Sequence, residues 1–102
     1  MLQIQLDVQP ITEKRLRKLL DSVEDQEIFA QNFINFQISE LNKSLFNISI
    51  DMKNFENKYN VTTDKFYSAY QEGKIGDSED YMVWAGIYEM YQENEKKLQE
   101  LS

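Results

Sequence analysis

The chain offers few side chains that could carry out catalysis, because it contains neither histidine nor cysteine. Without them, the common nucleophile–base pairs, the usual zinc ligands and the proton carrier that works near neutral pH are missing. Carboxylates, lysines and tyrosines remain for acid–base chemistry. Glu72 and Glu89 could serve, but both fall on polar faces of predicted helices, with no pocket indicated beside them. We therefore expect no enzyme activity and no cofactor.

The acidic run Asp77-Ser78-Glu79-Asp80 has two interpretations, a calcium site or the start of a helix. A calcium loop of the EF-hand type needs alternating ligands and a closing glutamate, and this run has neither. Capping by Asp77 or Ser78, with carboxylates in the first turn, explains the same residues. The sequence therefore predicts a helix start and no metal site.

Aromatic side chains follow at helical spacing and form the most prominent candidate binding surface. Tyr81, Trp84, Tyr88 and Tyr91 lie on one stripe of a helix predicted over 79–100, and Phe66 and Tyr70 share a face of a short helix predicted over 63–72. Such a stripe is typical either of a core or of a binding surface. We assign these six residues to partner binding. The net charge of −7 favours a basic protein partner and disfavours nucleic acid.

Length and composition limit the elements that could position these residues. A chain of 102 residues is one domain's worth, and its three glycines and one proline favour long helices over a many-turned β fold. All of them except Gly86 fall at predicted element boundaries. No apolar run is long enough to span a membrane, and the first residues lack the features of a secretory signal, so a cytoplasmic protein is expected.

Residues 2–8, LQIQLDV, alternate strictly between apolar and polar side chains, which predicts a half-buried strand. No second strand is evident, and an unpaired strand leaves its backbone groups without partners. The same strand of another copy is the favoured partner, and a free edge strand in a monomer is the alternative. Pro10 and the apolar spacing that follows predict a helix over about 10–23.

A long helix is predicted from about Asp25 to Tyr59. Its apolar residues are spaced four and three apart: Ile34, Ile38, Leu41, Leu45, Ile48, Met52, Phe55 and Tyr59. This seam could pack against the C-terminal helix of the same chain or against another chain. Further apolar residues widen the stripe beyond the needs of a two-stranded coiled coil. Asn47 and Ser49 favour helix weakly, so a break could occur within 46–50.

The order of the first 45 residues, LQIQLDV-QP-ITEKRLRKLL-DSVED-QEIFAQNFINFQISEL, resembles the ribbon-helix-helix arrangement. The resemblance implies a mainly α fold with one short N-terminal strand, in which two chains pair their strands and interlock their helices. It implies a dimerisation region over 1–45 and a partner-binding region over 46–102. The dimer contacts would come from Leu2, Ile4, Leu6, Val8, Leu16, Leu20, Ile34 and Ile38. The second half, NKYNVTTDKFYSAYQEGKIGDSEDYMVWAGIYEMYQENEKKLQEL, is similar to small acidic antitoxin-like proteins.

In ribbon-helix-helix repressors the outward residues of the strand contact DNA bases, which implies that role for Gln3 and Gln5. The chain departs from that pattern, because the Asp7 carboxylate repels phosphate. In addition, Asp25-Gln26-Glu27 places two carboxylates at the helix N-terminus, where a DNA phosphate would bind. Residues 1–45 carry five basic and seven acidic side chains, so the basic footprint of a DNA-binding domain is missing. The cluster formed by Lys14, Arg15, Arg17 and Lys18 suggests phosphate contacts, but a solvated helix face explains it better.

Three functions are therefore compatible with the sequence. The first is an antitoxin-like homodimer whose acidic, aromatic C-terminal helices neutralise a basic toxin, and residues 46–102, with a net charge of −5, favour it. The second is a transcriptional repressor that uses the strand ribbon on DNA. The third is a helical scaffold or adaptor dimer without further activity.

Overall fold

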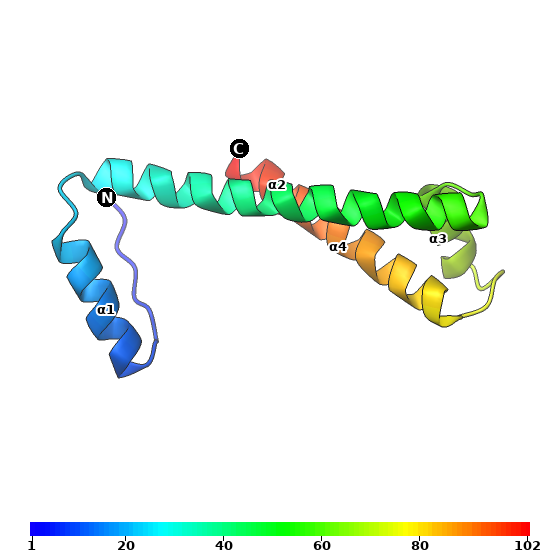
Figure 1. The fold of residues 1–102 in the computed structure, drawn as a ribbon. Coiled ribbons are helices and arrows are strands. Elements are labelled where there is room, and N and C mark those ends of the chain that lie inside the picture. Colours follow the sequence, from blue (N-terminus) through cyan, green and yellow to red (C-terminus); the bar gives the residue numbers. More distant parts are fainter. The chain divides into compact units, whose positions relative to one another are not determined.

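The computed structural model describes residues 1–102 and contains four α-helices and no strand. Figure 1 shows α1 (Pro10–Asp21), α2 (Gln26–Tyr59), α3 (Thr63–Gln71) and α4 (Glu79–Leu101). The chain divides into two compact units, Met1–Phe33 and Ile34–Ser102, and the first turns of α2 belong to the first unit. The predicted α class and the four predicted helices are confirmed. None of the helices is long and apolar enough to cross a membrane.

The predicted strand over residues 2–8 is wrong for the single chain. Residues 1–9 have no regular secondary structure, and no hydrogen bond involves the backbone of residues 1–8. The physical reason is that a strand exists only through pairing with a second strand, and the chain supplies none. The alternation of apolar and polar side chains therefore describes a segment whose backbone groups are still available for pairing.

Within the first unit, α1 begins at Pro10, whose missing N–H is not needed in the first helical turn. Glu13 lies in that turn and accepts a hydrogen bond from Arg17 at 3.2 Å. The helix ends at Asp21, two residues before the predicted end. Asp25 then caps α2, because its carboxylate accepts the backbone N–H groups of Glu27 and Ile28 at 3.0 and 3.2 Å.

The second unit contains the rest of α2, which is continuous through Phe46–Ile50, so the break considered there does not occur. The Ser49 hydroxyl donates to the carbonyl of Phe46 at 2.6 Å and so finds a partner within the helix. Asn60, in the left-handed conformation with φ of 55°, ends the helix as predicted.

Burial varies along the heptad seam of α2. Ile48 is buried, the other seam residues from Ile38 to Tyr59 are half-buried, and Ile34 is exposed.

The helix α3 follows after a tight turn and ends in a Schellman motif. Thr62 caps its start by accepting the N–H of Lys65 at 3.4 Å, as the sequence predicts. At its end, Gly73 has φ of 72°, its N–H donates to the Tyr70 carbonyl, and the Lys74 N–H donates to the Ala69 carbonyl. A residue with a Cβ adopts this conformation only at a cost, which explains the glycine.

The helix α4 runs back along α2 within the second unit (Figure 1), and Ser78 caps its start by accepting the Tyr81 N–H at 3.3 Å. The Asn94 amide donates to the Ser44 hydroxyl of α2 at 2.9 Å. The heptad seam is therefore used for packing within the chain over this stretch. The core lies where α2, α3 and α4 meet, and its buried residues are Phe66, Trp84 and Ala85.

Candidate interaction surfaces

Two of the six aromatic residues assigned to partner binding lie in the interior of the chain. Trp84 is 0% exposed and Phe66 is 3% exposed, and their rings stack with centroids 3.8 Å apart. Phe55 of α2 stacks on the same indole, with centroids 5.3 Å apart. These two residues therefore form the core, in this conformation, and present no surface to another molecule. The remaining four are half-buried: Tyr70, Tyr81, Tyr88 and Tyr91.

A chain of polar contacts, buried between Trp84 and Thr63 and half-buried at Glu56, connects this core to the start of α3. The indole N–H of Trp84 donates to the Thr63 hydroxyl at 3.1 Å, and that hydroxyl donates to the Glu56 carboxylate at 2.8 Å. The same Glu56 oxygen accepts the backbone N–H of Thr63 at 2.8 Å. Buried polar atoms are costly without partners, and here none is left unpaired. The carboxylate of Glu56 also places negative charge at the N-terminus of α3, where the helix dipole favours it.

Tyrosine hydroxyls and carboxylates close the edges of the core. Tyr59 donates to Asp80, Tyr67 donates to Glu89 at 2.9 Å, and Tyr88 donates to Asp64 at 2.8 Å. Each carboxylate acceptor raises the pKa of its tyrosine, because it stabilises the protonated hydroxyl. Hydrogen bonds from Lys58 (at 2.7 Å) and then from Tyr59 lower the pKa of Asp80. The acidic run at 77–80 thus serves helix capping and packing, and no group of three or more potential ligands gathers to hold a metal ion.

No family model matches this chain. No curated protein and no solved structure is significantly similar to it either. Its surfaces must therefore be judged from their own chemistry.

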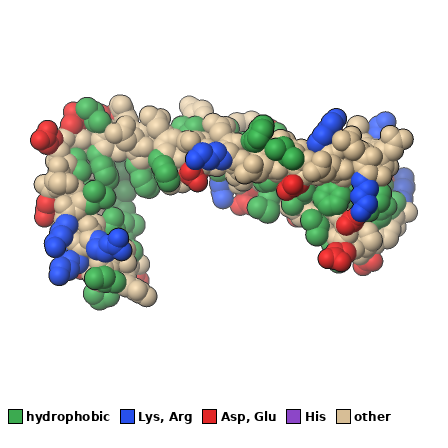
Figure 2. All heavy atoms as spheres, viewed as in Figure 1, with side chains coloured by type: hydrophobic (Ala, Val, Ile, Leu, Met, Phe, Trp, Pro, Cys, Tyr) green, Lys and Arg blue, Asp and Glu red, His purple; other side chains and the backbone are tan.

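The first unit, Met1–Phe33, has no buried residue at all, although it carries a row of apolar side chains (Figure 2). Leu2 is 81% exposed and Ile4 is 69% exposed. Of the eight residues predicted to form a dimer contact, Leu16 and Ile38 are half-buried and the rest are exposed: Leu2, Ile4, Leu6, Val8, Leu20 and Ile34. Apart from Ile34 and Ile38, which belong to the second unit, these residues gather in the first unit. We call Leu2, Ile4, Leu6 and Val8 the N-terminal apolar row.

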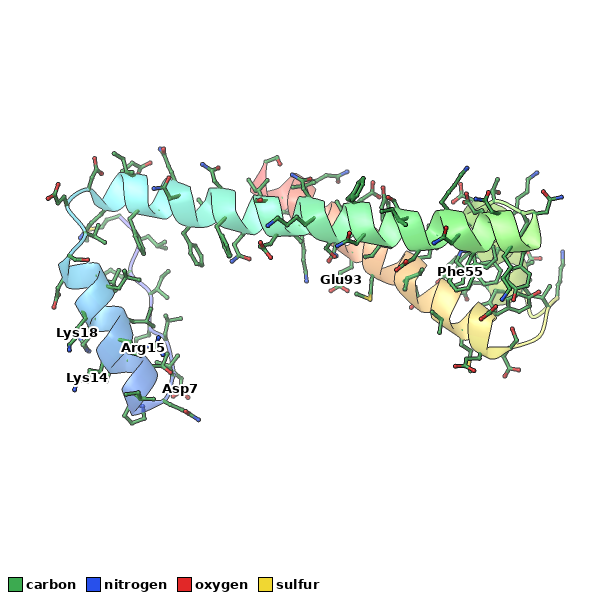
Figure 3. The ribbon with its side chains drawn as sticks, in the orientation of Figure 1. Asp7, Lys14, Arg15, Lys18, Phe55 and Glu93 are labelled. Atoms are coloured by element: carbon green, nitrogen blue, oxygen red, sulfur yellow. The ribbon has the colours of Figure 1, made fainter.

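The polar side chains predicted to contact DNA are also exposed in the first unit. Gln3 and Gln5 alternate with the apolar row, and Asp7 follows them on the same segment. Figure 3 shows Lys14, Arg15 and Lys18 on α1, where they project into solvent. None of these three forms an ion pair, whereas Arg17 pairs with Glu13 at 3.2 Å. The unit therefore holds both carboxylates and unpaired cations.

A second exposed apolar surface lies on α4, in the second unit. Met82, Val83 and Met90 are each about half exposed, with Gly86 between them at helical spacing. We call these four residues the methionine face. An open groove lies beside it and is lined by residues of α2 (Asp51, Asn54, Phe55 and Lys58) and of α4 (Val83 and Ile87). Figure 3 shows Phe55 on the side of α2 toward α4, and Glu93 further along α4.

Gly86 is unusual because nothing within the chain explains it. Glycine in a helix interior is less stable than alanine by about 0.5–1 kcal/mol. A Cβ at this position would meet no atom within 4 Å, so no neighbour in the chain requires its absence. The methionine face was not predicted from the sequence, because its residues fall outside the aromatic stripe. The one available signal was that Gly86 alone among the glycines does not lie at an element boundary.

Proposed function

We propose that this protein is an antitoxin-like interaction protein, which self-associates through residues 1–33 and binds a basic partner protein with residues 34–102. The observation that carries the proposal is the lack of any buried side chain in Met1–Phe33 beside a row of exposed apolar residues. Fully burying an aliphatic side chain stabilises a complex by about 1.5–3 kcal/mol. Four such residues in each copy supply a sufficient reason to associate.

Backbone hydrogen bonding supports an identical copy as the first partner. The backbone of residues 1–8 forms no hydrogen bond, and its side chains already alternate as a paired strand requires. Pairing with the same segment of a second copy would satisfy these groups and bury the N-terminal apolar row against its counterpart. This arrangement agrees with the resemblance to ribbon-helix-helix domains.

The acidic charge supports a basic protein as the second partner. The second unit carries seven lysines, no arginine and twelve carboxylates, so its net charge is −5. A net negative charge accelerates encounter with a basic protein and repels nucleic acid. Neutralisation of a toxin is the specific form of this binding that the resemblance of the C-terminal half implies.

Self-association is tested by light scattering on the full chain and on two variants that gain the same charge at adjacent positions. Ile4→Lys puts the charge in the apolar row and should give a monomer. Gln5→Lys puts it on the polar side of the segment and should leave the dimer intact. A wild-type chain that stays monomeric at high concentration refutes self-association.

Partner binding is tested by co-expressing the full chain with the protein encoded beside it. We expect the two proteins to co-purify and their complex to weaken as the salt concentration is raised. We also expect the chain to relieve the growth inhibition caused by the protein encoded beside it. A neighbour that is not retained and has no effect on growth refutes the antitoxin proposal.

A transcriptional repressor is the second candidate, and the unpaired Lys14, Arg15 and Lys18 favour it, together with exposed Gln3 and Gln5. Glutamine can pair with adenine through two hydrogen bonds. A gel shift with the DNA upstream of its own gene separates the candidates. The repressor requires a shift at low salt that is lost when Gln3 and Gln5 are both changed to alanine.

A further inference from the structure

We infer that the methionine face of α4 and the groove beside it bind an amphipathic helix that carries basic residues along its flanks. This inference rests on the proposed function, because it specifies the surface by which residues 34–102 contact a basic partner. It starts from Met82, Val83, Gly86 and Met90, none of which the core of the chain uses.

The shape of the surface suits a helix. Met82, Gly86 and Met90 are four residues apart and form a line along α4, and the groove lined by Phe55, Val83 and Ile87 runs beside that line. A helix binds in such a place through apolar side chains at helical spacing. Methionine side chains adapt to the shape of a bound helix, because they are unbranched and polarisable.

Gly86 is the second, independent observation. Its missing Cβ leaves open space at the centre of the line, and no atom of this chain fills that space. Glycine permits the close approach of another backbone. Contact with a second molecule would therefore explain why a glycine stands at this position. The glycine thus marks the point where a bound helix would come nearest to α4.

Charge decides which kind of helix fits. Around the surface, carboxylates outnumber lysines four to two: Asp51, Asp80, Glu89 and Glu93 against Lys58 and Lys97. Both lysines are already paired within the chain, Lys58 with Asp80 at 2.7 Å and Lys97 with Glu93 at 3.5 Å. Asp51 has no partner in the chain, and Glu89 accepts only the Tyr67 hydroxyl and no cation, so a lysine or arginine of the bound helix can pair with these carboxylates.

The same charges argue against two other occupants. A second copy of this chain would bring identical carboxylates against one another, which is unfavourable. A membrane surface rich in anionic lipids would also be repelled. A basic helix is therefore the occupant to which we commit.

The test uses the full-length chain and a synthetic 18-residue helical peptide with leucines on one face and lysines on the other. A matched peptide carries glutamate in place of every lysine. We expect calorimetry to show binding of the lysine peptide, and the glutamate peptide to bind at least tenfold more weakly. Equal binding of both peptides, or no binding of the lysine peptide, overturns the inference.

Substitutions locate the site. Gly86→Leu fills the open space and should weaken binding of the lysine peptide at least tenfold. Gln92→Leu adds the same side chain on another side of α4 and should leave binding unchanged. Gly86→Ala gives the sharpest result, since it should raise the melting temperature of the free chain while weakening binding severalfold. Unchanged binding by Gly86→Leu, with helix content intact, refutes the site.

These outcomes are distinct from failure of the proposed function. Suppose that the chain dimerises and retains the neighbouring protein, but Gly86→Leu changes binding of neither the peptide nor that protein. The proposed function then stands, and the proposed binding surface is refuted. A chain that binds the lysine peptide through Gly86 but retains no neighbouring protein keeps the surface and loses the antitoxin assignment.

Discussion

The two units of the chain contain nearly the same share of apolar residues and use them in opposite ways. Fourteen of the 33 residues in Met1–Phe33 are apolar, against 28 of the 69 in Ile34–Ser102, yet every buried residue belongs to the second unit. The second unit holds eleven of the thirteen aromatic residues and has helices that fold back on one another. Apolar content alone therefore does not make a core; large side chains and a chain that returns on itself are also needed.

This contrast assigns separate tasks to the two units. The second unit closes its core with its own residues, from Phe55 on α2 to Trp84 on α4. The first unit leaves the N-terminal apolar row uncovered and its backbone unpaired. The second unit should therefore be stable in a single chain, whereas the stability of the first unit should rise with protein concentration.

The largest effect is expected from a substitution in the core of the second unit. Phe66→Ala removes a ring that stacks on Trp84 at 3.8 Å and should lower the free energy of unfolding by about 3–5 kcal/mol. Urea titration monitored by the fluorescence of Trp84, the single tryptophan, measures this loss. Phe33→Ala, the same change at an exposed position of the first unit, should shift the value by at most about 0.5 kcal/mol. Equal losses would show that the contrast between the units is wrong.

A smaller effect is expected from the polar chain behind Trp84. Thr63→Val keeps the shape of the side chain but leaves the indole N–H without an acceptor, at a cost of about 1–3 kcal/mol. Ser68→Ala, at an exposed position of the same helix, is the control and should be nearly neutral. A red shift of Trp84 emission at low urea would show that water has reached the indole. A neutral Thr63→Val would mean that the hydrogen bond adds no stability.

Glycine substitutions sharpen the account of the second unit. Gly73→Ala should destabilise it by about 1 kcal/mol, because alanine disfavours the φ of 72° that ends α3. Gly76→Ala is the matched control in the same loop, where φ is not positive and nothing lies within 4 Å of the added Cβ. Thermal unfolding monitored by circular dichroism compares the two. A stable Gly73→Ala variant would contradict the Schellman motif.

The smallest effect concerns alkaline pH. The pKa values of Tyr59, Tyr67 and Tyr88 are raised above the ordinary 10.0, so the folded chain binds more protons than the unfolded chain near that pH. The stabilisation that these tyrosines contribute is present below pH 10 and is lost as pH rises through their folded pKa values. Absorbance at 295 nm should show later ionisation in the folded chain than in urea.

Asp64→Asn tests the cause of that shift. The variant removes the carboxylate that accepts the Tyr88 hydroxyl at 2.8 Å, so the pKa of this tyrosine should move back toward its ordinary value. Ser68→Ala should leave the titration unchanged. Identical curves for the folded and unfolded wild-type chain would contradict all three tyrosine–carboxylate contacts.

The sequence predicts most of the helical architecture because helix signals are local. Asp25, Thr62 and Ser78 cap helices where expected, and Asn60 ends α2. The strand prediction fails because its evidence, alternation, says nothing about whether a pairing partner is present. Continuity through residues 46–50 could not be decided locally either, since weak helix propensity there is overridden by packing of the seam.

The candidate sites were less predictable, because they depend on which face a neighbouring helix covers. Periodicity placed Trp84 and Phe66 on shared faces but could not tell a core from a binding surface. The hydrogen bonds of Glu56 to Thr63 connect two helices across a turn, and no spacing rule indicated them. The methionine face became visible only when the structure showed which residues of α4 the core leaves exposed.

The order in which the two units leave the ribosome follows from their positions in the chain. The N-terminal apolar row is made before α3 and α4, which supply the buried Phe66 and Trp84. At about 5–20 residues per second, some seconds pass during which the apolar row is exposed and the core of the second unit does not yet exist. Neighbouring nascent chains on one messenger RNA would meet at that stage through the segments they have already made. Under the proposed self-association, assembly would precede folding of the second unit, and we expect a mutation in the apolar row to show its first effect during translation.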